Sequence, residues 1–405
     1  MSRWVRLVAA VVAMIQIANL QYAWTLFVQP LRDANGWSLS EVQWGFTIFI
    51  ALETWAMPLT GWLIDAKGAR LLMSVAGILC GIGWAGIGMT HSLPMMYFLY
   101  GLAGFGAAIV YCGSIGVALK WFPDRRGVAA GIIAAGFGSG AALFIPIIRY
   151  ILQVQDYSAA LLYTGIVQGV LIVLAAQFLG GPGMAPAHMP ATKAAQPVRR
   201  QKDDFSSGEM LHNGRFYWLY AMMLMMGIGG LLATAQVAPV ARTYGIAESF
   251  LAISLVLNPI ANGTGRLFWG WVSDRLGRER TMEIAFFIQA LSLLSVGLLG
   301  PRSGAMFVAS MAMVFFTWGE VYVLFPSALA DFFGSKNASS NYSFLYSTKG
   351  VASIVAGGLA ATIFEMTGSW GPAFYGSAML ALISVFMATR LKKMPLPVKP
   401  QASAA

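Results

Sequence analysis

The chain has 405 residues, of which 58% are hydrophobic and 10% are charged, and its mean hydropathy is +0.68. A soluble domain of ordinary composition carries about 25% charged residues, so this chain is excluded from that class and is typical of a protein that crosses a membrane many times. The formal net charge of +10 could suggest a nucleic-acid partner. Because the basic residues instead follow a membrane topology, as described below, we expect no nucleic-acid binding.

Apolar runs of about 20 residues, the length that crosses a bilayer as a helix, recur along the whole chain. A bilayer core admits only helices or closed barrels, and runs of this length are helices. We therefore expect an all-α polytopic membrane protein with twelve spans and no soluble catalytic domain, and hence no enzyme. The expected spans are 4–30, 41–64, 71–90, 94–119, 128–154, 159–180, 216–241, 248–272, 281–300, 304–330, 342–364 and 370–389.

Residues 181–214 interrupt the apolar pattern halfway along the chain. This segment contains Pro182, Pro186, Pro190 and Pro197 and has no apolar periodicity, which is typical of a mobile linker. It separates a predicted N-terminal six-helix bundle (1–180) from a C-terminal six-helix bundle (215–391), which is followed by a tail (392–405). Prolines inside the predicted spans are expected to introduce bends. These are Pro58, Pro146, Pro239, Pro259 and Pro326.

The distribution of the 26 Lys and Arg residues predicts the orientation of the chain. If both termini and the linker are cytoplasmic, most of these residues fall on the cytoplasmic side, as is usual for membrane proteins. Only Arg32, Arg149, Arg242 and Arg302 lie on the opposite side. No cleavable signal or organellar targeting segment is evident. We expect a monomeric, multi-pass protein in the lipid bilayer of the plasma membrane, which is the inner membrane in a bacterium.

The cysteines and histidines do not suggest a metal or cofactor site. Cys80 and Cys112 lie within predicted spans, where a disulfide is not expected, and His91, His188 and His212 lie in loops. We expect no metal ion and no cofactor.

Two cations, Arg266 and Lys349, lie inside otherwise apolar spans. An ionised side chain at membrane depth costs roughly 3 to more than 10 kcal/mol, so such residues usually face a partner, water or a substrate path. With a rise of 1.5 Å per residue, they lie about 9 Å and 7 Å to the cytoplasmic side of the middle of their helices. Arg binds one carboxylate through two parallel hydrogen bonds, whereas Lys adds a point charge. We therefore expect an anionic ligand; the alternative is that both side chains reach the lipid headgroups.

Two acids, Glu53 and Glu320, also lie at membrane depth. Acids in this setting are paired or protonated, so each either neutralises a cation, carries a proton with the substrate, or forms a fixed ion pair that holds helices together. Glu320 lies between Trp318 and Tyr322, which predicts that it is the acid nearer the site. An ionised Glu320 would leave one positive charge on the cation pair, which favours a monocarboxylate; a neutral Glu320 would leave two, which favours a dianion.

A Gly-x-x-x-Asp-x-x-Gly motif ends the second and the eighth predicted span. Its glycines allow close helix approach and a tight turn, and its acid can accept hydrogen bonds from a neighbouring helix N-terminus. Two copies at matched positions indicate an internal repeat, and we expect these loops to act in conformational change. The residues are Gly61, Asp65, Gly68 and Arg70 in the first copy and Gly270, Asp274, Gly277 and Arg278 in the second.

This paired motif, with six spans on each side of a basic linker, resembles the major facilitator superfamily over essentially the whole chain. The resemblance implies two six-helix bundles related by a pseudo-two-fold axis, with a substrate site between them near the midplane of the membrane. It also implies transport by alternating access, in which the two bundles rock around the site.

Within that superfamily the chain looks like the oxalate:formate antiporter group, a relative of the monocarboxylate transporters. The segments that carry this resemblance are 21–26, 109–127, 262–270, 315–326 and 346–353. In that group an arginine of helix 8 and a lysine of helix 11 are regarded as the carboxylate-binding pair, and aromatic residues enclose the anion. The resemblance implies a substrate site formed by Arg266, Lys349, Tyr22, Tyr111, Trp318, Tyr322, Tyr346, Phe137 and Gln21.

We therefore expect a secondary active transporter of small carboxylates such as oxalate, formate and lactate, working by oxalate:formate-type anion exchange. The alternative is a proton-coupled symporter of monocarboxylates. The oxalate-specific members carry no acid at the positions of Glu53 and Glu320, and they have Tyr in place of Phe137 and Trp in place of Tyr346. A missing hydroxyl removes a hydrogen bond worth about 1 kcal/mol. These differences leave the particular carboxylate open.

Overall fold

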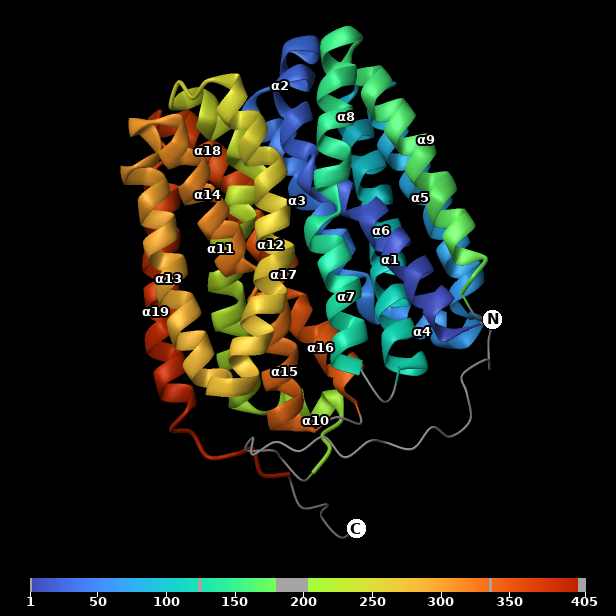
Figure 1. Cartoon of the computed structure of the whole chain (residues 1–405), viewed down its shortest axis with the longest axis vertical. Coiled ribbons are helices and arrows are strands. Elements are labelled where there is room, and N and C mark those ends of the chain that lie inside the picture. Colours follow the sequence, from blue (N-terminus) through green and yellow to red (C-terminus); the bar gives the residue numbers. More distant parts are fainter. Residues whose placement is uncertain (1, 123–125, 180–202, 335–336, 400–405) are drawn as a thin grey trace.

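The structure is a computed structural model that describes residues 2–122, 126–179, 203–334 and 337–399. Most of the predicted linker, its His188 and the last residues of the predicted tail lie outside these ranges. The described residues form helices joined by short turns, with no strand among them. The chain before the linker and the chain after it lie side by side, and they are coloured blue to green and yellow-green to red in Figure 1.

The first part of the chain contains α1 (Arg3–Tyr22), α2 (Trp24–Asn35), α3 (Leu39–Trp55), α4 (Met57–Lys67), α5 (Ala69–Ile87), α6 (Leu93–Trp121), α7 (Arg126–Ser139), α8 (Ala141–Val154) and α9 (Tyr157–Ala176). The second part contains α10 (Ser207–Leu211), α11 (Gly214–Thr243), α12 (Glu248–Leu276), α13 (Arg278–Leu298), η1 (Gly300–Arg302), α14 (Gly304–Trp318), α15 (Val321–Phe333), α16 (Ala338–Tyr346), α17 (Thr348–Ile354), the π-helical turn η2 (Val355–Leu359), α18 (Ala360–Thr367) and α19 (Gly371–Leu391). We call the end at which α1 begins and α19 ends the basal end, and the opposite end the apical end (Figure 1).

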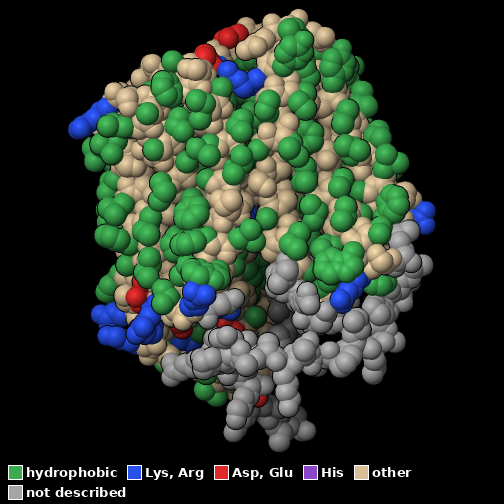
Figure 2. Space-filling model, viewed as in Figure 1, with side chains coloured by type: hydrophobic (Ala, Val, Ile, Leu, Met, Phe, Trp, Pro, Cys, Tyr) green, Lys and Arg blue, Asp and Glu red, His purple; other side chains and the backbone are tan. Residues whose placement is uncertain are grey.

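Ten helical segments among the described residues are long and apolar enough to cross a membrane. They correspond to ten of the twelve predicted spans. The other two, 41–64 and 248–272, are also helical, in α3–α4 and in α12, but they carry buried polar residues that lower their hydropathy. The count of twelve spans therefore stays a prediction. Hydrophobic side chains cover the flanks of the molecule, and charged side chains gather toward its two ends, as expected for a protein embedded in lipid (Figure 2).

Several of the long helical segments are interrupted near their middle. The interruptions lie at Ala23, Ala56, Gly140, Gly319 and Ser347. At Gly319 the interruption also allows close packing, because a Cβ there would lie 2.6 Å from the backbone oxygen of a residue of α12. Interrupted helices are common around the substrate sites of secondary transporters. The interruptions therefore indicate a candidate site in the middle of the molecule.

The two copies of the glycine motif form the same turn. Gly68 ends α4 and begins α5 with φ 85° and ψ 149°, and Gly277 ends α12 and begins α13 with φ 85° and ψ 160°. Only glycine adopts this conformation readily, so the repeat in the sequence is also a repeat in structure. After these turns, the Arg70 Nε donates to Gln177 at 2.9 Å, and the Arg278 Nε lies 3.3 Å from a carboxylate oxygen of Asp331. The side chains of Asp65 and Asp274 lie outside the described part of the structure.

The end of the predicted linker is docked on the second part of the chain. Phe205 packs against Phe333 with ring centroids 5.5 Å apart, and its backbone N–H donates to the Phe333 carbonyl at 2.9 Å. The Asn337 and Asn341 amides donate to the Phe205 carbonyl at 2.9 Å and 3.2 Å. Residues 203–211 therefore attach to the turn between α15 and α16.

Candidate anion-binding site

Lys349, at the start of α17, is held by three polar groups, two of which come from the first part of the chain. Its Nζ donates to the Gln21 Oε1 of α1 at 2.8 Å, to the Glu53 Oε2 of α3 at 2.8 Å, and to the Tyr346 hydroxyl at 3.4 Å. Lys349 is 2% exposed, and Gln21 and Glu53 are fully buried. The lysine therefore points into the protein rather than toward the headgroups, and Glu53 compensates its charge in this conformation.

Arg266, in the middle of α12, has no acidic partner among the described residues. Its Nη1 donates to the Ala134 carbonyl of α7 at 3.1 Å, and its Nε donates to the Asn262 Oδ1 at 3.2 Å. The Nη2 is buried and has no hydrogen-bond partner in the described structure. With 2% of its surface exposed, Arg266 does not reach the headgroups. It therefore offers a desolvated positive charge and an unused donor, the two features that an anion satisfies.

Phe137 of α7 lies close to both cations. The Arg266 Cζ is 5.8 Å and the Lys349 Nζ is 5.4 Å from the centroid of its ring. Tyr22 and Tyr111 pack edge-on against the same ring with centroids 5.8 Å and 5.6 Å away. The negative face of an aromatic ring attracts a nearby cation, so this packing helps to hold two like charges near each other.

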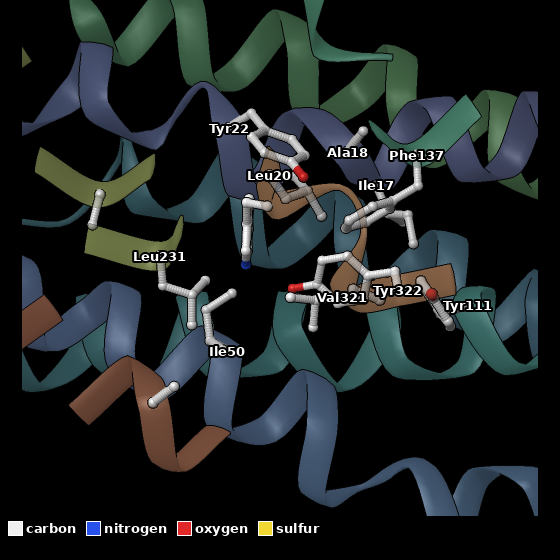
Figure 3. Packing of buried hydrophobic residues seen from close by; sticks show 14 of the residues in the cluster. Ile17, Ala18, Leu20, Tyr22, Ile50, Tyr111, Phe137, Leu231, Val321 and Tyr322 are labelled. Atoms are coloured by element: carbon white, nitrogen blue, oxygen red, sulfur yellow. The ribbon is translucent and has the colours of Figure 1, made fainter. Parts of the chain in front are cut away.

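The ring contacts continue into the second part of the chain. Tyr111 lies 5.3 Å from Tyr346, Tyr346 lies 5.9 Å from Tyr322, and Tyr322 lies 5.4 Å from Trp318, all between ring centroids. The Arg266 Cζ lies 4.5 Å from the Tyr322 centroid. Figure 3 shows the labelled rings gathered from α1, α6, α7 and α15. We use the name aromatic cage for Tyr22, Tyr111, Phe137, Trp318, Tyr322 and Tyr346.

Asn262 is a further polar residue of the site. Its Oδ1 accepts from the Tyr22 hydroxyl at 3.3 Å as well as from the Arg266 Nε, and its Nδ2 donates to the Phe315 carbonyl at 3.1 Å. Asn262 therefore links α1, α12 and α14 beside the arginine. Asn262 lies four residues before Arg266, and side chains at this spacing share a helix face. This spacing could have identified Asn262 as a site residue in the sequence.

All the residues for which the sequence predicted substrate binding come together in this cluster, and Glu53 forms an ion pair with a cation, which is one of the roles expected of the two acids. Glu53 contacts Lys349, whereas Glu320 is fully buried with no partner for either carboxylate oxygen among the described residues. The expectation that Glu320 is the acid nearer the site is therefore wrong. Glu320 is two residues from both Trp318 and Tyr322, and residues at that spacing do not share a helix face.

Direct hydrogen bonds join the two parts of the chain on the apical side of the site. There Gln43 donates to the Ala235 carbonyl at 2.8 Å, Thr47 donates to the Ser353 carbonyl at 2.9 Å, and Thr25 accepts from a backbone N–H of α11 at 3.0 Å. The most exposed residues of the aromatic cage, Tyr322 and Tyr111, are 8% and 6% exposed. In this conformation the rings of the aromatic cage are buried, and these hydrogen bonds hold the two parts of the chain together on the apical side.

Comparison with known proteins identifies the family. The chain matches the family described as the Major Facilitator Superfamily over residues 9–237 and 218–405. It is 39% identical to the oxalate:formate antiporter of Oxalobacter formigenes, over 98% of this chain and 94% of that protein. It is 23% identical to apicoplast pyruvate carrier 1 of Toxoplasma gondii, over 88% and 76% of the two chains, and 26% identical to human monocarboxylate transporter 11, over 66% and 56%. These are transporters and not enzymes. The chain belongs to the major facilitator superfamily, in the family of the oxalate:formate antiporter.

Proposed function

We propose that this chain exchanges small carboxylate anions across the membrane by alternating access, in the manner of an oxalate:formate antiporter. The observation that carries this proposal is the placement of Arg266 and Lys349 within one aromatic cage between the two parts of the chain. A buried cation with an unused donor favours an anionic ligand, and the cage surrounds a ligand of a few heavy atoms with rings from both parts of the chain.

In this proposed mechanism, the chain forms twelve spans in two six-helix bundles, 1–180 and 215–391, which are joined by the linker 181–214. The basal end is cytoplasmic, because the basic residues of the loops and of the tail 392–405 belong on that side. The protein acts as a monomer in the plasma membrane, the inner membrane in a bacterium. The matched turns at Gly68 and Gly277 act as paired hinges at the cytoplasmic ends of the bundles as the bundles rock.

An anion binds this site by replacing weak contacts of the cations. The Arg266 Nη2 is free to donate, and the Nε and Nη1 exchange their neutral acceptors for a carboxylate. Charge-assisted hydrogen bonds of this kind are roughly twice as strong as neutral ones. The bound anion also screens the repulsion between Arg266 and Lys349. The rings of Tyr22, Tyr111 and Phe137 belong to the other part of the chain and enclose the anion only when the two parts close, so binding favours the closed conformation and couples substrate to the rocking motion.

The second candidate function is proton-coupled transport of a monocarboxylate such as lactate or formate. The ion pair between Lys349 and Glu53 favours it, because a carboxylate side chain in contact with a substrate-binding cation can take up a proton when substrate displaces it. We place this coupling role on Glu53 rather than on Glu320, because Glu320 has no polar partner in the described structure.

Uptake of labelled oxalate, formate and lactate into proteoliposomes tests the proposal. We expect oxalate or formate uptake that requires a carboxylate inside the vesicle and that is lost in Lys349→Gln. Uptake of lactate that is driven by a proton gradient, with no need for internal carboxylate, would favour the second candidate. Absence of lysine-dependent flux for all three anions would contradict both.

A further inference from the structure

The positive charge of Lys349 is compensated by an acid of the protein itself. Its partner Glu53 contacts it through Oε2 at 2.8 Å, while the Glu53 Oε1 is buried and has no partner among the described residues. Removing one member of a buried ion pair leaves the other as an uncompensated charge, which is strongly unfavourable. A substrate carboxylate that binds Lys349 must therefore share the lysine with Glu53, or Glu53 must lose its own charge.

Three side chains among the described residues can carry a charge at the site near pH 7. Arg266 and Lys349 each contribute one positive charge and Glu53 contributes one negative charge, so the site carries one net positive charge when all three are ionised. Tyrosine and cysteine side chains are neutral near pH 7, and the charged groups of the neighbouring α2 and α18, Arg32, Asp33 and Glu365, lie toward the apical end. The titratable groups that interact electrostatically with Glu53 include Lys349 on α17, Tyr22 on α1, Tyr100 and Tyr111 on α6, Cys80 on α5 and Tyr346 on α16.

We propose that Glu53 is a proton-binding site that matches the net charge of the candidate site to the charge of the bound anion. This inference rests on the proposed carboxylate transport. When Glu53 is ionised, the site has one net positive charge and accepts a monocarboxylate on Arg266. When Glu53 is protonated, it releases Lys349, the site has two net positive charges, and a dicarboxylate dianion bridges Arg266 and Lys349.

This role of Glu53 determines the net charge that crosses the membrane in one exchange cycle. An oxalate dianion crosses together with one proton, which Glu53 takes from the solution on the side of entry and releases on the other side. A formate anion crosses without a proton. Exchange of external oxalate for internal formate therefore brings in one net negative charge and removes one, so the cycle moves no net charge and carries one proton inward.

Proteoliposomes loaded with formate test this inference on the wild-type protein. Labelled oxalate is added outside, a potential is imposed with potassium and valinomycin, and a pH dye is enclosed. We expect one proton to enter for each oxalate. We also expect the final ratio of internal to external oxalate, the oxalate gradient, to be independent of the potential. If one net charge moved instead, about 100 mV would shift that gradient about fiftyfold. A potential-dependent gradient without proton entry would overturn the proposal, whereas the absence of any exchange would contradict the proposed function itself.

The variant Glu53→Gln gives the residue-level test. Glutamine keeps the shape of the side chain and fixes the site at two positive charges. We expect proton entry to stop, exchange to become potential-dependent, and the preference for oxalate over formate at pH 8 to rise at least about tenfold. In the wild type the KM for oxalate should increase with pH as Glu53 loses its proton, and the KM for formate should not. Wild-type proton coupling that persists in Glu53→Gln would overturn the assignment to this residue.

Glu320→Gln is the matched control, because it makes the same chemical change at another buried carboxylate, one that forms no hydrogen bond with Lys349 or Arg266 among the described residues. It should keep the coupling, the potential response and the pH dependence of the wild type. Loss of proton coupling in Glu320→Gln, with coupling retained in Glu53→Gln, would transfer the proton site to Glu320. Thermal unfolding of both variants shows whether each is folded, and the wild-type proton count stands without either variant.

Discussion

Lys349 of α17 and Glu53 of α3 form an ion pair of 2.8 Å that joins the two parts of the chain, with side chains 2% and 0% exposed. The pair lies beside the aromatic cage, so the same lysine serves in the structure and in the proposed substrate site. The consequences of these two roles can be separated by experiment.

Removal of Lys349 alone should lower stability as well as transport. In Lys349→Met the Glu53 carboxylate loses its cation in an apolar interior, and breaking a buried pair in this way costs about 3–5 kcal/mol. The double variant Lys349→Met with Glu53→Gln should recover the melting temperature of the purified protein but not its transport. A single variant as stable as the wild type would contradict the structural role of the pair.

Arg266→Lys should raise the KM for carboxylates by about tenfold or more, because a lysine cannot make two parallel hydrogen bonds to one carboxylate. Arg275→Lys is the control on the same helix, since Arg275 is exposed and stacks on Trp271 at 3.9 Å. Initial rates of uptake over a range of substrate concentrations measure the change. An equal KM in Arg266→Lys and the wild type would remove Arg266 from the site.

Phe137→Tyr should increase the preference for oxalate over formate. The ring lies within 6 Å of both cations, and a hydroxyl added at its edge can donate to a second carboxylate that formate lacks. A hydrogen bond to a charged group is worth about 1.5–3 kcal/mol, which corresponds to roughly tenfold or more in the ratio of KM values. An unchanged or reduced ratio would show that the ring does not face the anion.

Gly358→Ala should block exchange but retain substrate binding from the apical side. A Cβ at Gly358 of η2 would clash with the Trp44 ring of α3, so this variant should be unable to close the apical side. Gly376→Ala on α19 is the control, because no atom lies within 4 Å of the added Cβ. Binding and exchange of labelled oxalate measure the two steps. Normal exchange in Gly358→Ala would contradict the need for this contact in closure.

The sequence predicted the apolar helices and the residues that the structure brings together around Arg266 and Lys349, because apolar runs, buried charges and family segments are local features. Arg266 and Lys349 were recognisable as cations in apolar spans, and Gly68 and Gly277 as matched turns. The resemblance to the family then supplied the aromatic residues of the cage.

Other features depend on tertiary packing and could not be predicted in this way. Glu53 and Lys349 are 296 residues apart in the chain, and nothing local indicates that Glu53 rather than Glu320 is the acid at the site. The prolines were poor guides to the helix interruptions. Pro239 and Pro259 lie within the unbroken α11 and α12, whereas the interruption at Ala23 lies several residues from any proline.

Counterflow in proteoliposomes tests most directly whether the protein transports small carboxylates through the candidate site. Vesicles are loaded with excess unlabelled formate or oxalate and diluted into labelled oxalate, with wild-type protein and with Arg266→Gln and Lys349→Gln. Transient accumulation of label in the wild type, absent in both variants and in empty vesicles, is the predicted result. Accumulation that persists in both variants, or no carboxylate-dependent accumulation in the folded wild type, would contradict carboxylate exchange through Arg266 and Lys349.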